Sequence, residues 1–151
     1  MRTMYIFWSA LLSALLAQFL KPVISFLFIS HKWDWSLAHA AGGFPSSHSA
    51  MVAALSLSVG LQEKFSSPLF AVTLTVACIV VYDAANVRYY CGQNAKVTQQ
   101  LVKDLKQKDP QTFNNPIYDT KLKNVLGHRW SEVFGGICLG GLIALIFHIC
   151  L

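Results

Sequence analysis

Long apolar runs separated by short polar segments make up the hydrophobic pattern of this chain. Residues 4–30 contain no acidic residue and one base, Lys21. Residues 65–82 and 133–151 contain no Asp, Glu, Lys or Arg. Since a helix needs about 20 apolar residues to cross a bilayer core, these runs predict transmembrane helices. The expected fold class is all-α, a polytopic membrane helical bundle.

About four transmembrane helices and one surface helix account for the pattern. The spans are expected over residues 1–29, 47–61 and 68–87, followed by a last helix that ends at residue 151. The second is short for a full span. Around residues 97–105 apolar positions recur with helical spacing among lysines, which indicates an amphipathic helix lying on the membrane surface.

Composition supports a single membrane domain over residues 1–151. The chain is 54% hydrophobic and 13% charged, against roughly 25% charged in ordinary soluble domains. Its net charge of +5 is not accompanied by a basic face interleaved with aromatic residues, which argues against nucleic acid as a partner. The four cysteines have no close pairing, so neither a metal site nor a disulfide framework is expected.

A polar stretch with the sequence Gly-Gly-Phe-Pro-Ser-Ser-His-Ser-Ala, residues 42–50, lies between the first two predicted helices. Its hydroxyls at Ser46 and Ser47, the imidazole of His48 and the backbone N–H groups near Gly43 suit a phosphate at a helix N-terminus. Pro-Ser-Ser is also a good helix opener, so a simple N-cap is the alternative interpretation.

Three further charged residues border the apolar runs. Lys21 lies inside the first run, where a lysine either serves a functional site or extends to the membrane interface. Asp83 and Arg88 lie at the end of the third predicted helix. They either form an ion pair that supports the bundle, or act as an orienting carboxylate and a phosphate clamp.

A second histidine opens the last helix. His128 and Glu132 are spaced i, i+4, so they share one helix face, and the carboxylate could hold one tautomer of the imidazole. Lys121 and Lys123 precede them as possible phosphate-binding cations.

The number of helices predicts that these features meet. With four spans, the segments after the first and third helices emerge on the same side as the start of the fourth. Most Lys and Arg residues lie on that side, so the positive-inside rule predicts a cytoplasmic site with both termini outside, as in a bacterial cytoplasmic membrane.

Four segments of the chain resemble the divergent type 2 phosphatidic acid phosphatase (PAP2) family. They are residues 42–50, Tyr-Asp-Ala-Ala-Asn-Val-Arg at 82–88, Gln-Asn-Ala at 93–95 and Leu-Gly-His-Arg-Trp-Ser-Glu-Val at 126–133. Well-characterised PAP2 enzymes carry an Arg-Pro after a lysine that Lys21 resembles, and a Ser-Arg before a histidine that His128 resembles. This chain lacks both pairs. Ser47 replaces a glycine, and Glu132 replaces an aspartate.

The resemblance implies a membrane-embedded phosphatase acting on an amphiphilic lipid or polyprenyl phosphate. His128, held by Glu132, would form a phosphohistidine, and His48 would act as general acid and then as base. Ser46 and the backbone near Gly43 would hold phosphate oxygens, while Lys21 and Arg88 would offset charge. No metal or cofactor is implied. The alternatives are a binding or transport protein that keeps the anion pocket without the chemistry, and a structural membrane protein.

Overall fold

The computed structural model describes residues 4–40, 42–109, 115–120 and 127–150. In these residues the chain is almost entirely helical and contains no β-strand, which confirms the all-α bundle. The elements, in chain order, are α1 (Met4–Ser25), the π-helix η1 (Phe26–Ser30), the 3₁₀-helix η2 (Trp35–His39), α2 (Ser47–Glu63), α3 (Pro68–Tyr82), the π-helix η3 (Asp83–Val87), α4 (Arg88–Lys108), the 3₁₀-helix η4 (Pro116–Asp119) and α5 (Trp130–Cys150).

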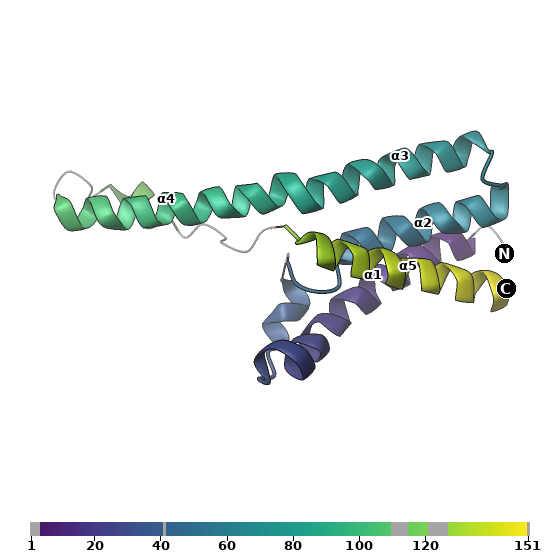
Figure 1. The fold of residues 1–151 in the computed structure, drawn as a ribbon, viewed down its shortest axis with the longest axis horizontal. Coiled ribbons are helices and arrows are strands. Elements are labelled where there is room, and N and C mark those ends of the chain that lie inside the picture. Colours follow the sequence, from purple (N-terminus) through teal and green to yellow (C-terminus); the bar gives the residue numbers. More distant parts are fainter. Residues whose placement is uncertain (1–3, 41, 110–114, 121–126, 151) are drawn as a thin grey trace.

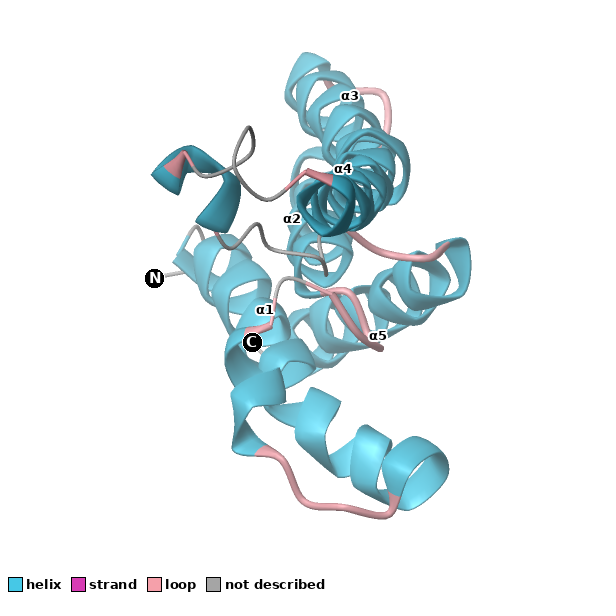
Figure 2. Cartoon of the chain, turned by 90° about the vertical axis from the view of Figure 1, so that its left-hand side faces the viewer, coloured by secondary structure: helices cyan, strands magenta, loops and turns pink. Residues whose placement is uncertain are grey.

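The central helix of the bundle is α2, which packs against α1, α3 and α5 (Figures 1 and 2). Glycines on α5 let it approach α2 closely. A Cβ added at Gly140 would lie 2.1 Å from the carbonyl oxygen of Ala50, and one added at Gly136 would lie 2.3 Å from that of Ser46. Because apolar burial does not drive helices together in lipid, such close packing is a main source of their association.

Hydroxyl groups connect α1 to α2. The Oγ atoms of Ser9 and Ser58 are 2.8 Å apart, and the Tyr5 hydroxyl donates to the Ser58 carbonyl at 3.1 Å. Ser13 Oγ donates to the Ala50 carbonyl, also at 3.1 Å. Interhelical hydrogen bonds of this kind contribute about 0.6 kcal/mol each in membrane proteins. The α1–α2 interface is therefore held by polar contacts as well as by shape.

Three helical segments are long and apolar enough to span a membrane: residues Met4–Phe28, Pro68–Lys108 and Trp130–Cys150. The central helix α2 has 17 residues, or about 25 Å, which is shorter than the roughly 30 Å of a bilayer core. The sequence had indicated this shortness. The bundle thus combines three spanning segments with a shorter helix packed among them.

The helix predicted around residues 97–105 is present within α4, but its placement differs from the expectation. It continues the axis of α3 through η3, so that Pro68–Lys108 forms one helical run of 41 residues. Figure 1 shows α4 extending beyond the bundle in line with α3. The sequence predicted a separate helix lying on the membrane surface, and this placement is wrong. The π-helical turn η3 joins α3 to α4 without a break in the helix.

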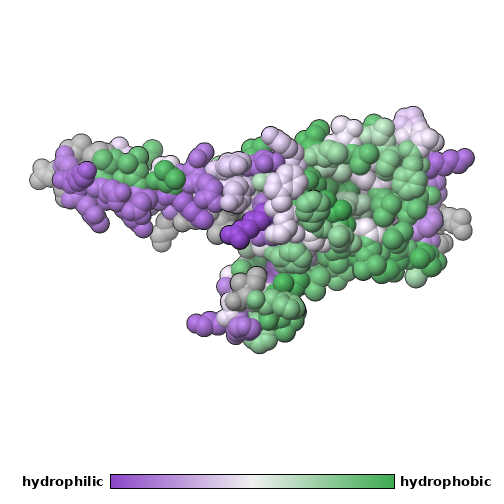
Figure 3. All heavy atoms as spheres, in the orientation of Figure 1, coloured by the Kyte–Doolittle hydropathy of each residue, from purple (hydrophilic) through white to green (hydrophobic). Residues whose placement is uncertain are grey.

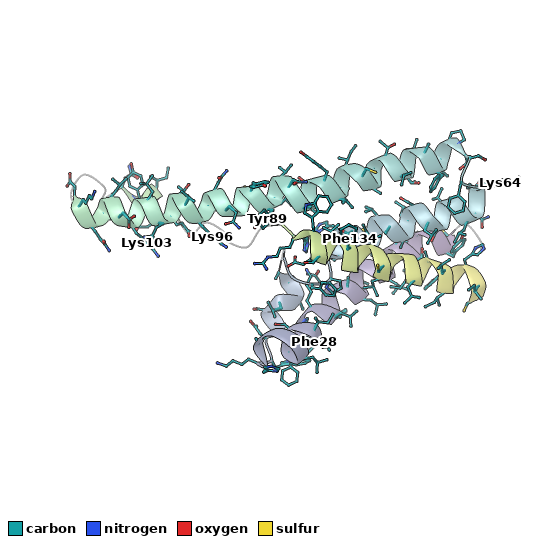
Figure 4. All side chains as sticks on the ribbon, in the orientation of Figure 1. Phe28, Lys64, Tyr89, Lys96, Lys103 and Phe134 are labelled. Carbon is teal, nitrogen blue, oxygen red and sulfur yellow. The ribbon has the colours of Figure 1, made fainter. Side chains whose placement is uncertain are left out.

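The two ends of the bundle carry different groups of features. The start of α1, the end of α5 and the α2–α3 turn with Lys64 lie at one end (Figures 1 and 4). The N-terminus of α2, η3 and the start of α5 lie toward the other end, from which α4 projects with Lys96 and Lys103. Hydrophobic residues cover the bundle, and hydrophilic residues cover most of the projecting arm (Figure 3).

Candidate active site

Two imidazoles from different helices face each other at the polar end of the bundle. His48 lies in the first turn of α2 and His128 lies just before α5, and their ring centroids are 6.3 Å apart at an interplanar angle of 62°. Backbone contacts fix this arrangement: the Ser46 N–H donates to the Glu132 carbonyl at 2.9 Å. The predicted meeting of residues 42–50 with the start of α5 is present in the structure.

His128 is buried, with 2% of its surface exposed. Its Nδ1 lies 2.8 Å from Oε2 of Glu132, and the same oxygen accepts from the Arg129 N–H at 3.3 Å. The other ring nitrogen, Nε2, is buried without a hydrogen-bond partner among the described residues. A carboxylate at Nδ1 favours the tautomer protonated there and leaves the lone pair on Nε2. An unpaired buried nitrogen is costly, and in active sites such an atom is often reserved for substrate.

The backbone of His128 is docked onto the π-helical turn η3. Its N–H donates to the Ala84 carbonyl at 2.9 Å. Gly127, at φ +76°, lies so close that an added Cβ would be 2.3 Å from the backbone nitrogen of Tyr89. A glycine is therefore required at this position for both conformation and space. π-Helical turns occur frequently at functional sites, and here the turn places the buried histidine.

Asp83 and Arg88 form an ion pair across η3, with Arg88 Nε 2.6 Å from Asp83 Oδ2. Residues five apart in an α-helix point about 140° away from each other. The π-helical turn brings them onto one face. The ion pair expected as one of two interpretations is thus present, while the Arg88 side chain remains about half exposed, at 52%.

Lys21 is buried at 3% exposure rather than extended to the interface. Its Nζ donates to the Ala40 carbonyl at 2.9 Å, and Glu132 acts on it electrostatically. The backbone of Gly43 packs beside its stem, with an added Cβ 3.7 Å from Cδ. Lys21 therefore belongs to the same polar cluster as the two histidines.

Two predicted phosphate ligands have other partners. Ser46 is fully buried, and its Oγ caps α2 by accepting from the Ser49 N–H at 3.3 Å and the Ser49 hydroxyl at 3.0 Å. The N-cap interpretation is confirmed, and the expectation that this hydroxyl also contacts a phosphate stays a prediction. The backbone of Gly43, at φ +95°, acts electrostatically on the Glu132 carboxylate and favours its charged form. Ser47 is partly exposed beside them.

His48 keeps an exposed surface and lies among several charges. It is outside the three spanning segments. Partial burial lowers the pKa of His48, and the nearby basic groups Arg88, His128 and Lys21 lower that pKa further, while Asp83 opposes them. His48 is therefore held toward its neutral form in the free protein.

Sequence reasoning did not find a small pocket of about 200 Å³ beside His128. Asn86 and Tyr89 come from the η3–α4 junction, and Arg129 and Trp130 from the start of α5. The position of Arg129 next to His128 was the available signal. Lys121 and Lys123, the other candidate cations, lie outside the described residues.

No group of three or more His, Cys, Asp or Glu residues that could hold a metal ion occurs within residues 4–40, 42–109, 115–120 and 127–150. The chemistry of this cluster is that of two imidazoles, one carboxylate and two or more cations. Such a set can bind an oxyanion, supply a nucleophilic nitrogen and exchange a proton.

A family model described as the divergent PAP2 family matches residues 3–143. The chain is 41% identical over 143 residues to the uncharacterized membrane protein YuiD of Bacillus subtilis (strain 168), covering 91% of this chain and 90% of that protein. No solved structure matches it.

Proposed function

The chain belongs to the divergent PAP2 family, and we propose that it is a membrane-embedded phosphatase that hydrolyses a lipid or polyprenyl phosphate through a phosphohistidine. The observation that carries this proposal is the state of His128. Its Nδ1 is held by Glu132 while Nε2 is buried without a partner among the described residues. A group that only supported the fold would gain stability by pairing that nitrogen.

The reaction would proceed in two steps. Nε2 of His128 attacks phosphorus, the bond from phosphorus to the lipid oxygen breaks, and His48 gives its proton to the leaving alkoxide. A water molecule then attacks the phosphohistidine while His48 takes up a proton, and the P–N bond breaks to release phosphate. Glu132 stabilises the imidazolium character that develops on His128.

Cations around the site would offset the charge of the transferring phosphoryl group. Lys21 is buried within the cluster. Arg88 is half exposed and could exchange part of its contact with Asp83 for phosphate oxygens. Arg129 borders the pocket beside His128. These groups would compensate for the Ser-Arg that well-characterised PAP2 enzymes carry in the third motif.

A second candidate function is a lipid-phosphate binding or transport protein. The observation that favours it is the engagement of Arg88 by Asp83 at 2.6 Å, which leaves a less complete phosphate clamp. The presence of histidines at both reacting positions favours the enzyme, because an anion site alone is better served by Lys or Arg.

The charge distribution supports a cytoplasmic site. Described cations gather toward the site end and the arm, whereas Lys64 marks the opposite end (Figure 4). By the positive-inside rule the site end would face the cytoplasm. The cations toward that end are Lys32, Arg88, Lys96, Lys103, Lys106, Lys108 and Arg129.

The test is phosphate release from a panel of lipid phosphates by the purified protein in detergent or nanodiscs, with His128→Ala as the matched control. The expected result is metal-independent release by the wild type and none by the variant. Saturable phosphate-lipid binding without release from any substrate in the panel would support the binding protein instead.

A further inference from the structure

An apolar groove runs along the bundle from the first turn of α2 toward the α2–α3 turn. Its volume is about 380 Å³, and its lining comes from α2, α3 and α5. Val52, Leu57, Leu74, Ala77 and Ile137 supply much of the wall. The groove is separate from the small pocket beside His128, which shares none of these residues.

One end of the groove lies at the first turn of α2. Ser49, the residue after His48, belongs to its lining, as does Val81 near the end of α3. The other end reaches Phe65 and Phe70, near the α2–α3 turn. The groove therefore extends from the helical turn that carries His48 into the apolar part of the bundle.

The dimensions of the groove match one hydrocarbon tail. From Val81 to Phe70 its wall follows eleven residues of helical rise, about 16 Å. One leaflet of a bilayer core is about 15 Å deep, which is half of the roughly 30 Å total. A volume of about 380 Å³ lies in the lower part of the range of roughly 300–1,000 Å³ for ligand sites.

We propose that this groove binds a hydrocarbon tail of the phosphate substrate and so selects phosphate esters by chain length. The inference rests on the proposed function for the identity of the headgroup. A phosphate held between His48 and His128 would place the attached tail at Ser49. The tail then lies along α2 toward Phe65 and Phe70.

The groove acts by alignment more than by apolar attraction. Lipid tails are as apolar as the groove wall, so moving a tail from the bilayer into the groove brings little hydrophobic gain. A shaped groove instead fixes the ester relative to His128, and correct positioning of reacting groups can contribute several kcal/mol to catalysis. Chain length should therefore affect kcat/KM up to the length of the groove and not beyond it.

The first experiment narrows the groove without touching the site. Leu74→Trp places a large side chain in the lining, and Ile79→Trp places the same side chain on an exposed part of α3 that does not line the groove. We expect Leu74→Trp to lower kcat/KM at least about tenfold for a hexadecyl phosphate while changing turnover of a water-soluble aryl phosphate less than about twofold. Ile79→Trp should leave both unchanged. Equal losses on both substrates, or no loss on either, would overturn the groove proposal.

The second experiment does not depend on turnover. Cys78 lines the groove, and replacing Cys91, Cys138 and Cys150 with serine leaves it as the single thiol. In the His128→Ala background, alkyl phosphates of increasing length should protect Cys78 from a small maleimide, reaching a plateau when the tail fills the groove.

The two proposals can fail separately. Protection of Cys78 by long-chain phosphates, together with no phosphate release by the protein with His128 intact, would retain the groove and reject the phosphatase. Release of phosphate without chain-length-dependent protection would retain the phosphatase and reject the groove.

Discussion

Glu132 Oε2 lies 2.8 Å from Nδ1 of His128, and this contact determines which ring nitrogen is available to a substrate. His128 lies two residues before α5 and Glu132 lies in the first turn of that helix, so the start of α5 and the bond from the His128 N–H to the Ala84 carbonyl set their arrangement. Through the Ser46 N–H and the Gly43 backbone, the same residue also anchors the segment that carries His48. Glu132 thus connects the two histidines.

Glu132→Gln tests this role. The amide can still contact Nδ1 but cannot stabilise an imidazolium, so we expect phosphate release to fall by about 10²–10⁴-fold. Phosphate release under substrate saturation and intrinsic tryptophan fluorescence as a check of folding are the measurements. Glu132→Asp should retain more activity than Glu132→Gln. Full activity of the glutamine variant in a folded protein would contradict the assignment.

His48→Ala tests whether His48 is the general acid, by comparing substrates whose leaving groups differ in their need for a proton. An alkyl phosphate needs a proton on the departing oxygen, whereas a nitrophenyl phosphate does not. We expect about a 10²–10⁴-fold loss for the alkyl ester and a much smaller loss in the burst of nitrophenol release. His128→Ala should abolish both reactions. A similar loss for both substrates with His48→Ala would assign His48 to binding.

The pKa of His48 should respond to its neighbours in opposite directions. That pKa is lowered by partial burial and by Arg88, and Asp83 raises it. Since removing a repelling cation stabilises the protonated ring, Arg88→Gln should raise the pKa of His48. Asp83→Asn should lower that pKa.

NMR titration of histidine-labelled protein measures these shifts directly. Inorganic phosphate should raise the pKa of His48 in the wild type, because a bound anion favours the imidazolium. Shifts of the opposite sign would mean that the two side chains do not act on this imidazole as the structure places them.

Gly140→Ala should destabilise the bundle, and Gly141→Ala should not. A methyl group at Gly140 meets the Ala50 carbonyl oxygen at 2.1 Å, whereas at Gly141 the nearest atom is a flexible Leu57 methyl at 3.8 Å. We expect a cost of about 1–3 kcal/mol for the first. Thermal unfolding in detergent provides the comparison, and equal melting temperatures would show that α5 can shift away from α2 freely.

Native and introduced cysteines test the sidedness of the site. Cys91 lies near the start of α4, toward the site end, and Lys64→Cys marks the opposite end. In cells, a membrane-impermeant maleimide should label Lys64→Cys but not Cys91, each as the single cysteine of its variant. The reverse labelling would place the site outside and overturn the cytoplasmic assignment.

The sequence was sufficient to predict the apolar helices α1, α2, α3 and α5 and the meeting of the two histidines, because apolar run length and the alternating direction of these helices determine both. It predicted about four spans, whereas three described segments are long enough to cross a membrane. It could not predict the π-helical turn at Asp83. A single turn with i→i+5 backbone hydrogen bonds leaves the pattern of hydrophobic residues almost unchanged. It also did not reveal the burial of Ser46. Capping and phosphate binding require the same residue types, and the close packing of α5 against Ser46 depends on tertiary structure that local sequence does not encode.

The π-helical turn also has a consequence for the length of the chain. Relative to a regular α-helix, a π-helical turn accommodates one additional residue. Deleting one residue between Asp83 and Val87 would restore ordinary helical geometry and leave α4 close to its present orientation, because the turn loses only the residue that it accommodates. It would also remove the carbonyl acceptor of His128 from its present place. Substitutions in this turn can be conservative, whereas a change in its length would alter the backbone on which His128 is docked.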